Sequence, residues 1–251
     1  MSYFGNKKEG EKIFRGAYTY MRNTNIYSEE SFEVFRDKKE MTYTFVSEVV
    51  SRVATGELLN INTRYVINKD YTPLEVTIHR SLGNQSVKEE YIFDIRRTRI
   101  NYSFTDAEGQ VSKCELATNP KFYITTSATC SSMLYLRNKK FDNTGKNYYS
   151  IIVSNNHWAY EGEPTINNIV LQRVTQTSEN IKVGDSNLEA TQYKLTEQSE
   201  DDVEVDPHGP PVVENDLRIW CSQHMTIPYL IKDNSGTKIE VKYLNNLDKD
   251  Q

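Results

Sequence analysis

Histidine is scarce in this chain, and its few histidines show no catalytic or metal-binding pattern. Four are spread along 251 residues without the spacing that a zinc site needs, so we expect no metal. The sequence also lacks GxSxG, HExxH, GxGxxG and P-loop motifs. Hydrolase, zinc-protease and nucleotide-binding functions therefore have no sequence signal, and we expect no cofactor.

Cysteine and long apolar runs are also rare. The three cysteines form no CxxC pair, which fits either one disulfide with an odd thiol or three reduced thiols (Cys114, Cys130 and Cys221). No window is apolar enough to span a bilayer, and residues 1–12 lack the apolar core of a signal peptide. We expect a soluble protein without a membrane span, cytoplasmic as the chain stands and periplasmic if a signal peptide was removed.

A surplus of basic residues is missing as well. The formal net charge is −5, whereas a protein that neutralises phosphates needs an excess of lysine and arginine. Nucleic acid is therefore not an expected partner.

Tyrosine and phenylalanine, in contrast, are plentiful. The 17 tyrosines and 9 phenylalanines, with many Val, Ile and Thr, are typical of β-strands. Only 37% of the residues are hydrophobic, which favours antiparallel sheets with one face in water. The length allows one large β domain or two small ones, and we expect a single β domain over residues 1–251.

Alternation of apolar and polar residues predicts strands along the first 117 residues, because successive side chains of a strand point to opposite faces. Leu74, Val76 and Ile78 form one inward face, while Glu75 and His79 point outwards or into a cavity. Similar patterns occur at residues 16–22, 31–36, 42–53, 58–67, 90–96, 99–104 and 111–117.

The pattern changes after residue 117. Residues 131–141 allow a helix, with Ser131 or Ser132 as its N-terminal cap. An aromatic loop follows at residues 155–164, and residues 197–216 are acidic and Pro-containing, so we expect a mobile loop there. Further strands are predicted at residues 148–154, 168–175 and 181–195, the last interrupted by a turn.

The closing stretch, residues 217–244, predicts a hairpin. On its first strand Arg218, Trp220 and His224 share one face, with Cys221 on the other. An Asp-Asn-Ser-Gly sequence then suits a tight turn, since Gly and Asn accept positive φ, and a strand with Tyr243 returns.

These patterns indicate eleven or twelve strands with no alternating βαβ signal. We expect a mainly β fold: a single large curved antiparallel sheet forming a half-barrel or open barrel, with one or two helices covering its concave face. The hollow is the expected place for a ligand. Open edge strands also leave room for a homodimer.

Five segments define the layout of the chain: GAYTYMR, SFEVF, DYTPLEVTIHR, IKVGDSNLEATQYKL and RIWCSQHMTIPYLIKDNSGTKIEVKYL. This layout resembles the curved sheet of the bacterial lipoprotein-carrier superfamily (LolA/LolB-like). The resemblance spans most of the chain but carries over no functional residue. The chain departs from those usually exported relatives in showing no signal and in having the acidic insertion. The superfamily includes lipid and lipoprotein carriers and at least one cofactor-free enzyme of bacterial pigment synthesis, so the resemblance implies one of these functions.

Pairs of side chains on shared strand faces are candidates for a site in the hollow. They would supply an aromatic wall, imidazoles for proton transfer and a carboxylate–guanidinium pair. The candidate catalytic residues are His224, His79 and Glu75. The candidate ligand-binding residues are Trp220, Arg218, Glu48, Arg52, Trp158 and Tyr243. The alternative is that the charged residues and His79 lie on the solvated face and Trp220 is ordinary core.

Two functions remain. In the first, the protein binds a hydrophobic or aromatic small molecule in the half-barrel, as a carrier or binding protein. In the second, the same cavity performs cofactor-free acid–base chemistry, as an isomerase, cyclase or lyase.

Overall fold

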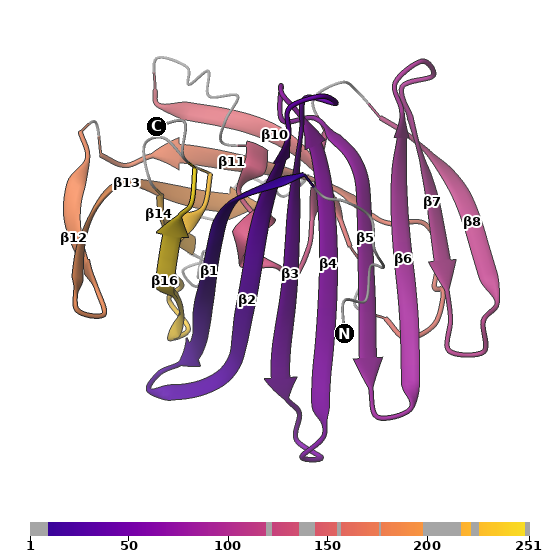
Figure 1. Cartoon of the computed structure of the whole chain (residues 1–251), viewed down its shortest axis with the longest axis horizontal. Coiled ribbons are helices and arrows are strands. Elements are labelled where there is room, and N and C mark those ends of the chain that lie inside the picture. The colour runs from indigo at the N-terminus through magenta and orange to yellow at the C-terminus, as the bar shows by residue number, and fades with distance from the viewer. Residues whose placement is uncertain are drawn as a thin grey trace, which may run out of the picture.

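The computed structural model describes residues 10–118, 122–135, 144–154, 157–175, 177–197, 217–221 and 226–248. Sixteen β-strands in these residues build one large, mostly antiparallel open sheet (Figure 1). The strand order is β8-β7-β6-β5-β4-β3-β2-β1-β16-β15-β14-β13-β11-β10-β9, and β12 pairs with β13 off this path. The first and last strands therefore lie side by side in the middle of the sheet.

The first half of the sheet is a meander of eight strands in chain order, each antiparallel to the next. Alternating side chains give this half one buried inner face, as the sequence predicts. The strands are β1 (Glu11–Arg22), β2 (Asn25–Asp37), β3 (Thr42–Arg52), β4 (Leu58–Asn68), β5 (Pro73–Leu82), β6 (Gln85–Asp94), β7 (Arg99–Thr105) and β8 (Val111–Ala117).

The second half is shorter-stranded and less regular. Its edge strand β9 runs parallel to β10, and the other pairs are antiparallel. The strands are β9 (Phe122–Thr125), β10 (Lys146–Val153), β11 (Ile166–Arg173), β12 (Glu179–Val183), β13 (Ser186–Glu197), β14 (Leu217–Cys221), β15 (Pro228–Lys232) and β16 (Thr237–Asn246).

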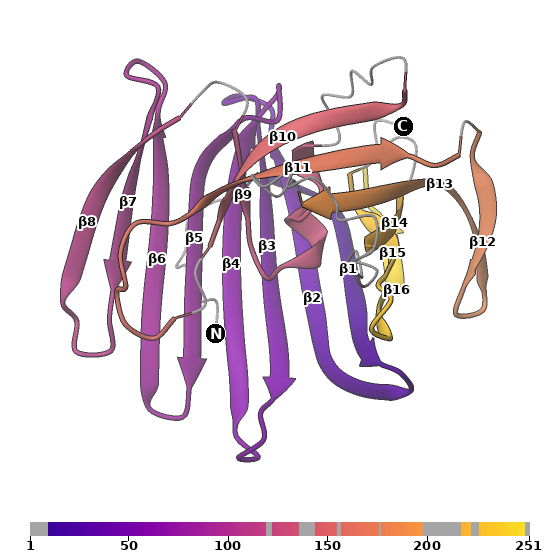
Figure 2. The same cartoon turned by 180° about the vertical axis from the view of Figure 1, so that it is seen from behind.

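Strands β10, β11 and β13 cross one face of the first half, as both views show (Figures 1 and 2). Edge strand β9 packs against β5, and the backbone N–H of its Ile124 donates to the Tyr65 hydroxyl of β4 at 3.2 Å. The main core lies between the two halves and is rich in rings; its fully buried ring side chains are Tyr18, Tyr65, Tyr91, Tyr102, Phe104 and Phe122.

A second, smaller core lies on the other face of the crossing strands. On β10, Ile152 belongs to the main core, whereas its neighbour Ile151 belongs to the second cluster with Tyr123, Tyr135 and Tyr149. The crossing strands therefore bury apolar side chains on both faces, which is why their sequences alternate less clearly than those of the meander.

The two halves join where β1 pairs with β16. The register shifts there between Ala17 and Tyr18, as a β-bulge does. Gly16 lies beside this shift and lets the Phe32 ring rest directly on its backbone, since an added Cβ would meet that ring at 2.4 Å. The chain beyond β16 is tied to the first half by the Arg36 guanidinium, which donates to both carboxylate oxygens of Asp248 at 2.8 and 2.9 Å.

The structure corrects the expected covering helix. The described part of the chain contains no α-helix; the region of the predicted helix begins in a 3₁₀ turn, η1 (Thr129–Ser131), and residues 136–141 of that helix lie outside the described residues. Strands cover the inner face in place of helices. The strand count is also higher than expected, partly because β9 was missed. The predicted acidic loop, apart from Glu197 at the end of β13, lies outside the described residues as well.

Candidate functional site

Glu30 is a carboxylate buried at the contact between the two halves. Alternation on β2 places it on the inner face with Phe32, and it is 1% exposed. Its Oε2 accepts the Tyr20 hydroxyl at 2.5 Å and the Thr129 backbone N–H at 2.8 Å. Its Oε1 accepts the Cys130 backbone N–H at 3.1 Å. The carboxylate thus holds the first residues of η1 against the meander.

Burial sets the chemistry of this cluster. Desolvation raises the pKa of Glu30, although hydrogen bonds from Tyr20, Cys130 and Thr129 lower it in part. Burial and the nearby Glu30 carboxylate raise the pKa of the Cys130 thiol well above its usual value. A thiol held protonated in this way is a poor nucleophile. We therefore interpret the cluster as a structural contact between η1 and the meander.

A second buried charge pair lies on β5 and β6. Arg80, with its side chain 4% exposed, forms an ion pair with the fully buried Glu89. Glu89 also accepts the Tyr91 hydroxyl at 2.8 Å and the Tyr102 hydroxyl at 3.5 Å. The Nη2 group of Arg80 donates to the His157 backbone carbonyl at 2.9 Å. Here too a charged group of the meander binds the backbone of the chain that crosses it.

The aromatic loop lies over this pair. Trp158 and Tyr160 are partly buried against the main core, and the Tyr160 ring lies 6.3 Å from that of Phe104. The prediction of an aromatic loop is confirmed for residues 157–164. The space expected between the halves is therefore filled by rings and by two buried charge clusters.

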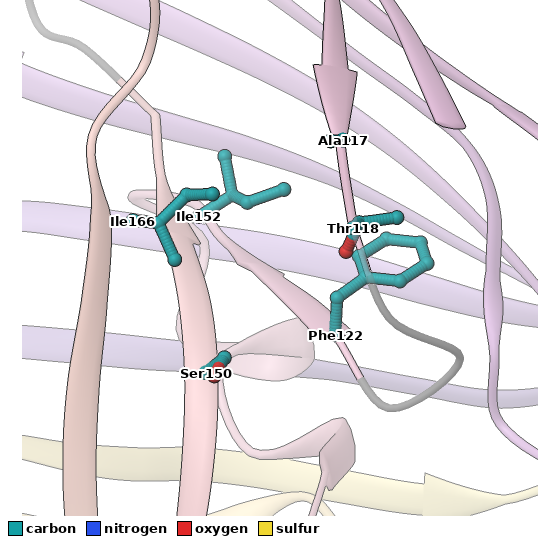
Figure 3. A pocket seen from close by; sticks show the side chains of 6 residues that line it. All are labelled: Ala117, Thr118, Phe122, Ser150, Ile152 and Ile166. Carbon is teal, nitrogen blue, oxygen red and sulfur yellow. The ribbon is translucent and has the colours of Figure 1, made fainter. Parts of the chain in front are cut away.

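An apolar cleft opens where the chain passes from β8 to β9 (Figure 3). Its volume is about 300 Å³. Side chains of β10 and β11 point across it towards those that follow β8, and two hydroxyls break its otherwise apolar wall. We call it the seam cleft; its lining residues are Ala117, Thr118, Phe122, Ser150, Ile152 and Ile166.

A second cleft, of about 530 Å³, lies by the turn between β1 and β2 and the start of β16. We call it the turn cleft. Every residue of its wall carries a polar group in its side chain, whereas four of the six residues of the seam cleft carry none; its lining residues are Arg22, Asn23, Asn25, Tyr27 and Thr237.

The candidate catalytic pair His79 and Glu75 lies on the outer face of the meander. Both alternate with Val76, Ile78 and Arg80, which face the main core. Glu75 pairs with Arg64 at 3.0 Å, and burial with two nearby cations lowers the pKa of His79. Residues four apart on a strand are separated by roughly 13 Å, so these two side chains do not meet.

Glu48 and Arg52 have the same placement on β3. Both are exposed and alternate with the buried Phe45 and Val49. Their spacing of four residues again separates them by roughly 13 Å. The structure therefore places these four predicted site residues away from the space between the halves, as the alternative interpretation of the sequence has it.

The Trp220 face of β14 is only partly described. Trp220 is half-buried against the main core, its indole N–H donates to Glu179 at 2.8 Å, and the Lys232 ammonium lies 5.7 Å from its ring. Arg218 is exposed on the same face. His224 lies outside the described residues, so its predicted role stays a prediction.

The remaining candidates are scattered. Trp158 lies in the aromatic loop, whereas Tyr243 is 46% exposed on β16, near the junction of the two halves. All three cysteines are free thiols. Among the described residues no cluster of His, Cys, Asp and Glu has the arrangement of a metal site, and no helix is long and apolar enough to cross a membrane.

Sequence reasoning missed the buried charges. Glu30, Arg80 and Glu89 occupy inner-face positions of their strands, and each has at least one apolar neighbour two residues away. That position within the alternation is the signal that could have revealed them, because a charge in phase with an apolar face must find partners.

Comparison with known proteins identifies a solved structure of similar fold. No family model matches the chain, and no curated protein matches it. It is similar to the crystal structure of a β-barrel-like protein of domain of unknown function DUF1849 from Brucella abortus, with 8% identity, a TM-score of 0.58, and coverage of 95% of this chain and 99% of that one. A DUF1089 family protein from Pseudomonas aeruginosa aligns with 10% identity, a TM-score of 0.48, and coverage of 81% and 88%. At such identity the first likeness shows the β-barrel-like fold alone.

Proposed function

We propose that the protein binds a small hydrophobic or aromatic molecule in the seam cleft, as a carrier or binding protein. The observation that supports this most is the cleft itself, whose volume of about 300 Å³ is at the lower end of ordinary small-molecule sites. Its wall combines apolar side chains with the Thr118 and Ser150 hydroxyls, a mixture that anchors an apolar body and orients one polar group.

The exposure of the cleft wall points the same way. Ile166 is 51% exposed although it lies directly beside the buried Ile152, its cross-strand partner, in the wall of the cleft. A guest in the cleft would cover this isoleucine, and burying apolar surface is the main driving force for such binding.

The carrier role also follows from the layout of the chain, which resembles that of the lipoprotein-carrier superfamily (LolA/LolB-like). In this proposal the guest lies at the seam between the sheet ends, because rings fill the space between the halves. Membership of that superfamily is part of the proposal.

The test is to fill the cleft. Ser150→Phe places a ring among the wall residues, and Asn25→Phe is the matched control because it fills the turn cleft instead. We expect the wild type and the control to bind 1-anilinonaphthalene-8-sulfonate equally, and Ser150→Phe to bind at least tenfold more weakly. Native mass spectrometry of gently purified wild type should show a retained apolar molecule. Equal binding by all three proteins would refute the seam cleft as the site.

One observation favours the enzymatic alternative, a cofactor-free isomerase, cyclase or lyase. Glu30 is a carboxyl group with a raised pKa beside Tyr20 and Cys130, and perturbed titratable groups gather at active sites. Its 1% exposure leaves a substrate no path to it, so binding is the preferred function. Turnover of a substrate by wild type that Glu30→Gln abolishes, with the fold intact, would reverse this preference.

A further inference from the structure

The two ends of the open sheet differ in a way that points to a partner. At one end, β9 is four residues long, and its residues Phe122–Ile124 are buried. At the other end, β8 is seven residues long and ends the strand order, and no element of the described residues lies beyond it in either view (Figures 1 and 2). It contains no proline, and its pairing with β7 has no register shift, so it lacks two of the usual protections of an edge strand.

The outward backbone groups of β8 can be identified from its pairing with β7. The turn between the two strands is closed by the Asp106 N–H donating to the Gln110 carbonyl, and the Thr118 N–H donates to the Thr98 carbonyl at the far end. Hydrogen-bonded and non-bonded pairs alternate along an antiparallel ladder. Residues 112, 114 and 116 therefore bond to β7, and the N–H and C=O groups of residues 111, 113, 115 and 117 point away from the sheet.

The side chains of β8 are arranged symmetrically about its centre. Cys114 is the middle residue of Val111–Ala117, and the oppositely charged Lys113 and Glu115 flank it on the outer face, both exposed. A second β8 laid antiparallel about a two-fold axis at Cys114 would set Lys113 opposite the partner's Glu115, twice. It would also match outward backbone groups to outward backbone groups along the whole strand.

Charge selects this register over its neighbours. Backbone matching also permits axes at Lys113 or at Glu115, but these place two lysines or two glutamates directly opposite each other, which is destabilising. The axis at Cys114 replaces both repulsions with attractions. An isologous pairing of this kind is the usual geometry of a homodimer.

We propose that β8 is a dimerisation edge, at which two copies of the chain pair antiparallel about Cys114 and join their sheets into one. Roughly eight backbone hydrogen bonds would form along the two strands. The charged residues of this edge lie outside the seam cleft, because neither Lys113 nor Glu115 lines it.

Charge reversal tests the pairing. Lys113→Glu and Glu115→Lys each set like charges opposite each other twice, so each variant alone should dimerise at least tenfold more weakly than wild type in sedimentation equilibrium at low salt. An equimolar mixture of the two variants should form a heterodimer as strong as the wild-type dimer, because every facing pair is then attractive. The double variant Lys113→Glu/Glu115→Lys should also dimerise.

Cys114 gives a second readout. Residues directly opposite in a non-bonded antiparallel pair have Cα atoms about 4.5 Å apart, within the range of a disulfide. Diamide, which takes up the two thiol protons and electrons, should link the wild-type dimer through Cys114, and Cys114→Ser should abolish the link. Cys130 and Cys221 are buried and serve as internal controls. A wild type that is monomeric at all concentrations, or a dimer indifferent to the charge reversals, would overturn the proposal.

Discussion

The first eight strands and the last eight differ in length, in order and in what their buried polar groups contact. Strands β1–β6 each have 10–13 residues and follow one another in chain order. In the second half, β9, β12, β14 and β15 have four or five residues, and the spatial order departs from the chain order. The meander rests on long regular ladders, whereas the crossing half depends more on the surface beneath it.

The buried charges explain how that surface holds the crossing half. Glu30 of the meander accepts backbone N–H groups of η1, and Arg80 donates to the backbone carbonyl of His157. The backbone groups of η1 and of His157 lie outside the strands, so no ladder supplies their hydrogen bonds. Buried backbone groups need such partners. The comparison shows that charges on the regular half supply these partners to the irregular half.

Removing Arg80, the buried cation of the meander, should have the largest effect on stability. Arg80→Ala leaves the Glu89 carboxylate buried without its cation, and the free energy of unfolding should fall by about 3–5 kcal/mol. Urea denaturation measures it. The control is Arg99→Ala, which removes the exposed ion pair with Glu115 and should cost less than about 1 kcal/mol. Equal losses in the two variants would show that the buried pair has no special weight.

Replacing Glu30 should loosen the crossing half while sparing the meander. A glutamine side chain has one acceptor oxygen where Glu30 uses two, so Glu30→Gln should cost about 1.5–3 kcal/mol. Hydrogen exchange should accelerate at residues 122–135 and stay unchanged in β5–β7. Glu33→Gln is the control on the same strand, because Glu33 pairs with Lys12 at the surface. Uniform acceleration over both halves would contradict a local role.

The same carboxyl group should give the contact between the halves a pH dependence. The pKa of Glu30 is raised by burial, so the folded state holds this proton more tightly than the unfolded state. Its contribution to stability is therefore fully present below the unfolded pKa and is lost as the pH rises through the raised folded pKa. Unfolding free energies of wild type, measured from acid to neutral pH, should fall relative to those of Glu30→Gln. If wild type instead gained stability over Glu30→Gln as the pH rises, the sign of this prediction would be wrong.

Tyrosine hydroxyls offer the smallest and sharpest contrast between the two cores. Among the described residues, Tyr135 in the second core donates to the Met133 thioether sulfur at 3.0 Å, a weak acceptor. Tyr135→Phe should therefore change the unfolding free energy by less than about 0.5 kcal/mol. Tyr91→Phe in the main core removes a hydrogen bond to the Glu89 carboxylate and should cost about 1.5–3 kcal/mol. Thermal denaturation of both variants measures the difference, and similar losses would remove the distinction.

The sequence predicted the meander well because its signal is local. Alternation placed Val76 and Ile78 on one inward face of β5, and both are buried. The faces of β14 were also predicted, with Cys221 buried and Trp220 opposite. Each of these depends only on the two-residue period of a strand.

The sequence failed where structure depends on distant contacts. Strand β9 is only four residues long, and Phe122, Tyr123 and Ile124 are all buried, so no alternation marks it. Its parallel pairing with β10 joins residues 122–125 to residues 150–153, and no local pattern encodes that pairing. Residue types around Ser131 suited a helix. Instead, the backbone N–H of Cys130 donates to Glu30, which lies 100 residues away along the chain. The seam cleft was missed for the same reason, since four separate segments of chain contribute to it.

The pairing of β1 with β16 has a consequence for the order in which the protein is made. During synthesis β1 emerges long before its neighbour β16, which leaves the ribosome only after β2–β15 have been made. The meander can zip up as it emerges, but one margin of its first strand stays unsatisfied until residue 246 has been added. Vectorial folding of this chain therefore contains an obligatory wait, during which that margin needs shielding from neighbouring nascent chains.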